Sequence, residues 1–101
     1  MFGLEDRYLK FIKDSLVLFF PSSDTKFYIF GSRSSGKHHQ YSDVDIAIDD
    51  HGLKIDPALI VKVSSYFENS TFPYEVDIID LNNISDNFKS IILDDLSQLT
   101  F

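Results

Sequence analysis

The sequence contains no cysteine, only four glycines and three prolines, and no long hydrophobic run. Without cysteine, disulfide bonds and thiolate-ligated metal sites are excluded, and a reducing cytoplasm is compatible with the composition. No apolar run approaches the roughly 20 residues that a membrane-spanning helix needs. Residues 1–10 lack a basic segment followed by an apolar one, so no signal peptide is expected. We therefore expect a cytoplasmic protein.

Positive charge is also scarce. Nine Lys and Arg residues stand against sixteen Asp and Glu residues, which gives a net charge of −7. A nucleic-acid-binding protein needs a basic face, so the charge argues against a broad surface of that kind. The one local group of basic side chains comprises Arg33, Lys37, His38 and His39.

The residues that are present indicate a globular domain. Hydrophobic residues make up 44% of the 101 residues, and ten of them are phenylalanine. A chain of this length supports one domain, residues 1–101, with a single modest core. No repeat and no Pro/Gly/Ser-rich linker divides it.

Hydrophobic periodicity predicts an alternation of helices and strands. The expected helices cover residues 4–20, 57–69 and 86–99, with a further helical turn at 32–35, and the expected strands cover 26–30, 43–49 and 74–81. This order gives an α+β fold, an α/β two-layer domain whose three-stranded mixed sheet packs against about four helices and leaves one face open.

Period-two alternation places aspartates on that open face. In strand 43–49, the apolar side chains share one face, while Asp43 and Asp45 share the other. In strand 74–81 the same alternation turns Asp77 away from the core. Burying unpaired carboxylates would be prohibitive, so the acidic face must meet water. We therefore expect Asp43, Asp45 and Asp77 to share an open sheet face.

These residue types suit phosphoryl or nucleotidyl transfer. Two carboxylates at i and i+2 of a strand lie about 6–7 Å apart, so both can reach one metal ion or hold two. Hard oxygen ligands that leave positions vacant suit Mg²⁺ or Mn²⁺. Gly31 and Ser32 follow a strand, where backbone amides and a hydroxyl can cradle phosphate oxygens. Arg33 and Lys37 would add cationic partners for a polyphosphate.

Each part also has an ordinary structural interpretation. A Gly-Ser pair after a strand is usually a turn, and an Asp-x-Asp pattern is often a solvated sheet face. Asp80 lies close enough to compete with Asp77 for the third role. Asp49 shares the parity of Asp45 but is expected to be a turn residue, and His38 and His39 are expected at the surface.

The combined pattern resembles the DNA polymerase β-like nucleotidyltransferase superfamily. Gly31-Ser32, ten further residues and then Asp43-Val44-Asp45 match its signature. The string GSRSSGKHHQYSDVDIAI is similar to the minimal nucleotidyltransferase (MNT) branch, and VDIIDL, which contains Asp77, resembles the strand of the third carboxylate. Ser34-Ser35 departs from the family pattern, in which Ala and a basic residue are frequent.

The resemblance implies a nucleotidyltransferase fold and an enzyme. Such domains bind an NTP, here ATP, with two Mg²⁺ or Mn²⁺ ions, and transfer the NMP to a hydroxyl. Asp43, Asp45 and Asp77 would be catalytic and metal-binding. The nucleotide-binding residues would be Gly31, Ser32, Arg33 and Ser42.

The resemblance also implies a partner. MNT proteins pair with helical HEPN proteins, and some act as antitoxins that transfer AMP to a tyrosine of that partner. With no residues left over for acceptor recognition, we expect such a partner here, and a homo- or hetero-oligomer. Apolar residues in excess of what the sheet can cover, among them Phe2, Phe20 and Phe101, agree with this. Two alternatives remain open: an antitoxin that acts by binding alone, and an enzyme acting on a small hydroxyl compound.

Overall fold

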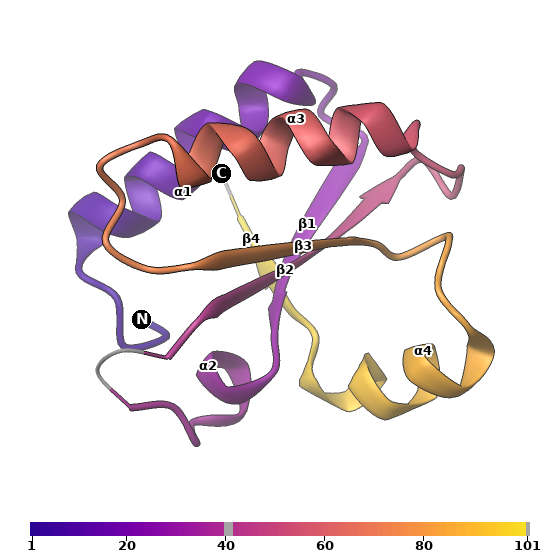
Figure 1. The fold of residues 1–101 in the computed structure, drawn as a ribbon. Coiled ribbons are helices and arrows are strands. Elements are labelled where there is room, and N and C mark those ends of the chain that lie inside the picture. Colours follow the sequence, from indigo (N-terminus) through magenta and orange to yellow (C-terminus); the bar gives the residue numbers. More distant parts are fainter. Residues whose placement is uncertain (40–41, 101) are drawn as a thin grey trace.

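The computed structural model describes residues 1–39 and 42–100 (Figure 1). The elements run in the order α1 (Asp6–Phe19), β1 (Thr25–Phe30), α2 (Ser32–Ser35), β2 (Val44–Asp50), α3 (Pro57–Glu68), β3 (Val76–Asp80), α4 (Asp86–Ile92), the 3-10 turn η1 (Leu93–Asp95) and β4 (Ser97–Leu99). None of the described helices is long and apolar enough to cross a membrane.

The strands form one mixed sheet in the order β3-β2-β1-β4. β1 is antiparallel to both β2 and β4, whereas β2 and β3 are parallel. A parallel pair needs a crossover connection, which α3 supplies between β2 and β3. The α/β two-layer fold with a mixed sheet is confirmed, but the sheet has four strands rather than the three predicted.

The fourth strand corrects the prediction of one closing helix over residues 86–99. Ser85 caps α4, its hydroxyl accepting from the Phe88 amide, but the α-helix ends at Ile92. Asp94 and Asp95 follow in η1, and negative charge at a helix C-terminus opposes the helix dipole. The chain then pairs with β1, and Leu99 becomes 5% exposed within the main core.

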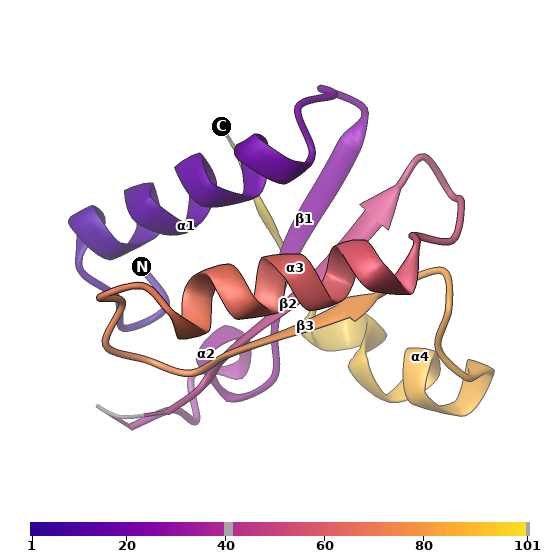
Figure 2. The ribbon, with the colours of Figure 1, turned by 45° about the horizontal axis from the view of Figure 1, so that its top comes forward.

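The main core lies between the sheet and two helices. α1 and α3 cover the same face of the sheet (Figures 1 and 2). Ile12 and Leu16 of α1, Ile46 of β2 and Val63 of α3 are fully buried there. The apolar face of β2 therefore meets the helices, as its alternation predicts.

The opposite face is covered at one end only. Phe30, Ala47, Leu81 and Ile92 form a second, smaller core beneath α4 (Figure 1). Ala47 shares the parity of Asp45 but is completely buried. The acidic face is thus open where β2 begins and closed where α4 packs.

Aromatic rings fix the segment that leads into β3. The Phe72 ring stacks on Phe11 of α1, with centroids 5.5 Å apart, and meets Phe67 of α3 and Tyr74 edge-on. Because Tyr74 lies two residues before β3, this cluster holds the chain close to where the edge strand starts.

The apolar residues that were predicted to exceed what the sheet can cover have different surroundings in the structure. Phe20 is 5% exposed and belongs to the main core, so its inclusion was wrong, because Phe20 packs edge-on against Phe27 of β1. Phe2 is partly buried against the same core. Phe101 lies outside the described residues.

Candidate active site

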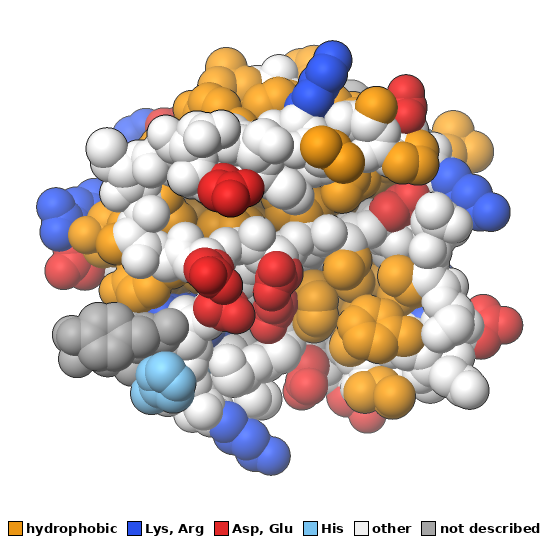
Figure 3. All heavy atoms as spheres, in the orientation of Figure 1, with side chains coloured by type: hydrophobic (Ala, Val, Ile, Leu, Met, Phe, Trp, Pro, Cys, Tyr) orange, Lys and Arg blue, Asp and Glu red, His pale blue; other side chains and the backbone are white. Residues whose placement is uncertain are grey.

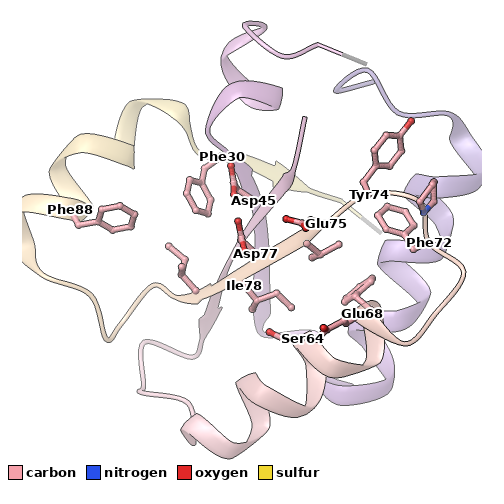
Figure 4. Close-up of a pocket in the computed structure, with 14 residues that line it drawn as sticks. Phe30, Asp45, Ser64, Glu68, Phe72, Tyr74, Glu75, Asp77, Ile78 and Phe88 are labelled. Carbon is pink, nitrogen blue, oxygen red and sulfur yellow. The ribbon is translucent and has the colours of Figure 1, made fainter. Parts of the chain in front are cut away.

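The parallel pairing of β2 and β3 brings two of the predicted carboxylates side by side. Asp45 and Asp77 are direct neighbours in the register, so their side chains share one sheet face. Asp43 immediately precedes β2 and is exposed. Figure 3 shows acidic side chains gathered in the middle of this face, and Figure 4 shows Asp45 and Asp77 directed into the same space.

The surroundings of Asp45 disfavour its charged form. Partial burial, then the negative charges of Asp77 and Asp43, and a hydrogen bond to the Asp77 side chain raise the pKa of Asp45 to about 6. Within the described part of the chain, no salt bridge to a basic side chain offsets these charges. The cluster is therefore a place where a cation would be stabilised.

Gly31 lies directly against Asp45. Phe30, at the end of β1, pairs with Asp45, and Gly31 continues the chain with φ +73°. A Cβ atom at Gly31 would lie 2.5 Å from Oδ2 of Asp45. Only glycine avoids both the strained φ and this overlap. The predicted Gly31-Ser32 turn thus lies against one of the predicted carboxylates, Asp45.

The serines of α2 have different surroundings. Ser32 opens α2 and is partly buried beside Gly31. Ser34 hydrogen-bonds through its hydroxyl to the Asp95 carbonyl and to the Ser97 hydroxyl, the latter at 2.7 Å. Ser34, which departs from the family pattern, therefore fastens α2 to the start of β4.

Arg33, predicted to bind nucleotide, is a buried residue. It is 2% exposed, and its guanidinium contacts backbone carbonyls. Nε and Nη2 donate to the carbonyl of Ser42 at 3.0 and 2.8 Å, and Nη1 donates to the carbonyl of Phe2 at 2.9 Å. The guanidinium carbon also lies 4.7 Å from the ring centroid of Tyr74. These contacts use Arg33 to hold the backbone just before Asp43.

Ser42 shares in the same arrangement. It is 9% exposed, and its hydroxyl accepts from the His39 amide at 2.9 Å. Arg33 and Ser42, both predicted to bind nucleotide, thus lie together but are engaged with each other and with backbone groups. Lys37 and His39 are exposed, and His38 is half-buried beside Gly3.

Asp80 and Asp49 have structural roles. Asp80 is 8% exposed, and its two carboxylate oxygens accept from the amides of Ile55 at 2.7 Å and Asn82 at 3.0 Å. Asp49 accepts from the Gly52 amide and from the side chain of Asn82, and the latter bond is the main reason that its pKa is lowered. Both carboxylates are thus engaged with groups outside the Asp45–Asp77 pair.

A cleft of about 810 Å³ lies along β3. Its floor contains Asp45 and Asp77, and its ends contain aromatic side chains (Figure 4). The lining residues are Phe30, Asp45, Ser64, Phe67, Glu68, Phe72, Pro73, Tyr74, Glu75, Val76, Asp77, Ile78, Ile79 and Phe88. The cleft is large enough for a nucleotide-sized ligand.

Glu75 and Glu68 belong to this cleft, although neither was predicted from the sequence. Glu75 lies two residues before Asp77, so period-two alternation could have identified it as a carboxylate on the same face. Figure 4 shows its side chain beside Asp77. Glu68 reaches the cleft from the end of α3, and no sequence pattern links it to β3.

The donor chemistry of the cluster fits a hard divalent cation. Among the described residues, no group of three or more His, Cys, Asp or Glu side chains is already gathered closely enough to enclose a metal ion. The adjacent carboxylates of Asp45 and Asp77 therefore suit an ion that takes its remaining ligands from phosphate and water, as Mg²⁺ commonly does.

Two comparisons with known proteins bear on this site. Residues 23–99 match the model of the family described as polymerase beta, nucleotidyltransferase. The chain is also 35% identical over 69 residues to a protein of Haemophilus influenzae named as the probable protein adenylyltransferase MntA. The match covers 68% of this chain and 60% of the relative. The chain thus spans less than two thirds of the relative's length.

Proposed function

We propose that this chain, which belongs to the polymerase beta nucleotidyltransferase family, transfers AMP from ATP to a hydroxyl group of a protein. The observation that carries the proposal is the contact between Gly31 and Asp45 beside Asp77. It unites a position where phosphates can approach the backbone with a cluster of carboxylates. The predicted membership of the nucleotidyltransferase family and its MNT branch is confirmed by the comparisons.

The residues have distinct roles in the proposed reaction. Gly31 and Ser32 hold the phosphates of ATP against the end of β1, and Asp77 accepts the proton of the acceptor hydroxyl. The acceptor oxygen forms a bond to the α-phosphorus, and the bond from that phosphorus to the bridging oxygen breaks. Pyrophosphate leaves with the electron pair. Positioning and charge stabilisation supply most of the catalysis in reactions of this type.

Asp43, Asp45 and Asp77 would hold two divalent ions, Mg²⁺ or Mn²⁺. When bound, the ions would neutralise charge on the phosphates and lower the cost of the like charges around Asp45. Arg33 and Ser42, in this proposal, position the start of β2 and make no direct contact with the nucleotide.

The acceptor we propose is a tyrosine of a HEPN-type partner, which the reaction inactivates, so that the chain acts as a cytoplasmic antitoxin. The name of the Haemophilus influenzae relative, a protein adenylyltransferase, supports a protein acceptor. It favours this acceptor over a small hydroxyl compound.

The decisive variant is Asp77→Asn. An amide still offers an oxygen ligand but cannot accept a proton, so ATP affinity should persist while the transfer rate falls about 10²–10⁴-fold. The assay measures label from α-labelled ATP on the co-purified partner, with mass spectrometry to locate the added AMP. Asp80→Asn is a poor control because it is buried, whereas Asp86→Asn on the surface of α4 should leave the rate unchanged.

A second candidate function is neutralisation by binding alone. Phe88, Ile91 and Leu93 are exposed by 38%, 73% and 57%, and Phe88 borders the cleft. Such a surface fits a protein partner. Suppression of partner toxicity by Asp77→Asn, with no AMP on the partner in the presence of wild-type protein, would establish this alternative and overturn transfer.

A further inference from the structure

β3 is an edge strand whose outer side faces the cleft. It ends the strand order, with β2 on one side only. Five consecutive residues, Glu75 to Ile79, line the cleft. Since successive side chains of a strand point to opposite faces, a cleft over one face would be lined by alternate residues. The cleft therefore runs along the free edge of β3.

The hydrogen bonds at the two ends of β3 indicate which backbone groups are free along this edge. The Glu75 carbonyl accepts from the Val44 amide at 2.8 Å, and the Leu81 amide donates to the Ile48 carbonyl at 2.9 Å. A parallel strand bonds to one neighbour through every second residue. The odd-numbered residues therefore bond to β2, and the amides and carbonyls of Val76 and Ile78 point outward.

The charge along this edge has one sign. Among the described residues, the carboxylates of Asp45, Glu68, Glu75 and Asp77 line the cleft, and no Lys, Arg or His does. Asp45 and Asp77 belong to the proposed metal cluster. Glu68 lies on α3, on the other side of the edge from that cluster (Figure 4). A ligand lying along β3 would thus meet negative charge on both sides.

We propose that the acceptor is bound as an extended segment that pairs with the free edge of β3. Its backbone bonds to Val76 and Ile78, and basic side chains next to its hydroxyl residue contact Glu68 and Glu75. Strand addition gives affinity through the backbone, and side-chain contacts give specificity. The inference rests on the proposed function, since it assigns the acceptor of the same reaction.

Hydrogen exchange gives the first test. The probe is a synthetic seven-residue peptide with a central tyrosine flanked by alternating lysine and valine, and its control has glutamate in place of lysine. The lysine peptide should slow exchange of the Val76 and Ile78 amides, while the Asp77 and Ile79 amides, already bonded to β2, should change little. No added protection with either peptide overturns the proposal.

Proline substitution gives the second test. Proline is tolerated on an edge strand where the amide faces outward, so Ile78→Pro should keep the bonds to β2 and lose one bond to the acceptor. Ile78→Ala is the matched control, because it also removes the isoleucine side chain but keeps the backbone amide. The KM for the lysine peptide should rise about three- to tenfold more in Ile78→Pro than in Ile78→Ala. Equal KM values in the two variants overturn strand pairing.

Glu68→Gln provides a variant whose folding is not at risk, because Glu68 is exposed at the end of α3. It should raise the KM for the lysine peptide, leave kcat unchanged, and leave the glutamate peptide unaffected. An unchanged KM contradicts the charge assignment. Peptide binding that protects Val76 and Ile78 without any AMP transfer would instead refute the proposed reaction and keep the binding edge.

Discussion

At the scale of single residues, Gly31 combines two constraints that can be separated by experiment. Gly31 and Gly36 both have positive φ, +73° and +80°, but a Cβ at Gly36 would have no atom within 4 Å. At Gly36, whose φ and ψ of +80° and +5° are left-handed helical, alanine costs about 1–2 kcal/mol of backbone strain. At Gly31, with φ +73° and ψ −149°, the backbone lies in a region essentially confined to glycine, and alanine costs about 1–3 kcal/mol. Only Gly31→Ala also presses on the carboxylate of Asp45.

We therefore predict that Gly36→Ala is less stable than wild type but keeps its transfer rate. Gly31→Ala should lose stability and also at least about 10²-fold in rate, because small displacements of reacting groups are costly. Urea unfolding and the labelled-ATP assay measure the two effects. Equal rates in the two alanine variants would contradict the close approach of Gly31 to Asp45.

Asp45 makes the stability of the protein depend on pH. Its pKa is about 6 in the folded protein, against an ordinary value of 3.8. The neutral form is favoured by folding, so the associated stabilisation is complete below pH about 4 and is lost as pH rises through about 6. Asp45→Asn should be more stable than wild type above pH 6, by roughly 1–2 kcal/mol after allowing for solvent screening.

Urea unfolding at pH 4 and pH 7.5, in buffer with a metal chelator, measures this difference. Asp49→Asn is a matched control of opposite sign. The lowered pKa of Asp49 contributes stability above its unfolded pKa, and that stability is lost as pH falls. Asp49→Asn should therefore destabilise the protein at pH 7.5. A gain from Asp45→Asn that is the same at both pH values would contradict the raised pKa.

The same residues show what the sequence could and could not predict about the site. Alternation along each strand was enough to place Asp45 and Asp77 on one face, because a pleated strand alternates strictly. Arg33 was predicted to bind nucleotide because a basic residue beside the Gly31-Ser32 turn could contact the phosphates. Its burial depends on the carbonyls of Phe2 and Ser42, whose approach no local pattern encodes.

At the scale of elements, β4 depends on one buried side chain. Leu99 is 5% exposed, whereas its neighbour Gln98 is exposed. We predict that Leu99→Ala lowers the free energy of unfolding by about 2–4 kcal/mol and that Gln98→Ala changes it by less than about 0.5 kcal/mol. Denaturant unfolding of both variants measures this. Similar small effects would contradict the pairing of β4 with β1.

The prediction of a helix over residues 86–99 failed for a reason that lies outside the segment. Phe88, Ile91 and Ile92 follow helical spacing and do form α4. Beyond them, the free edge of β1 offers backbone bonds that a local pattern cannot reveal. α3, in contrast, was predicted to begin at residue 57 and does, because the Asp56 cap and the proline at N1 are local signals.

At the scale of the whole molecule, a group of acidic side chains lies in the middle of the face shown in Figure 3, where the sheet is least covered. α1 and α3 close one face, and α4 closes half of the other (Figures 1 and 2). The mixed two-layer fold could be predicted from the order of elements alone. The order of elements could not predict which half of the second face stays open, because this depends on where α4 packs against Ala47.

The contacts of Arg33 have a consequence for how the protein folds. Its buried guanidinium is satisfied only when Phe2, Ser42 and Tyr74, which are distant in the sequence, have all come together. In a partly folded chain the Arg33 guanidinium would either stay in water or be buried without its partners. Burial without partners is costly. The end of the sheet that carries the proposed site should therefore assemble in one cooperative step, so that a chain with only part of its fold has no partial site.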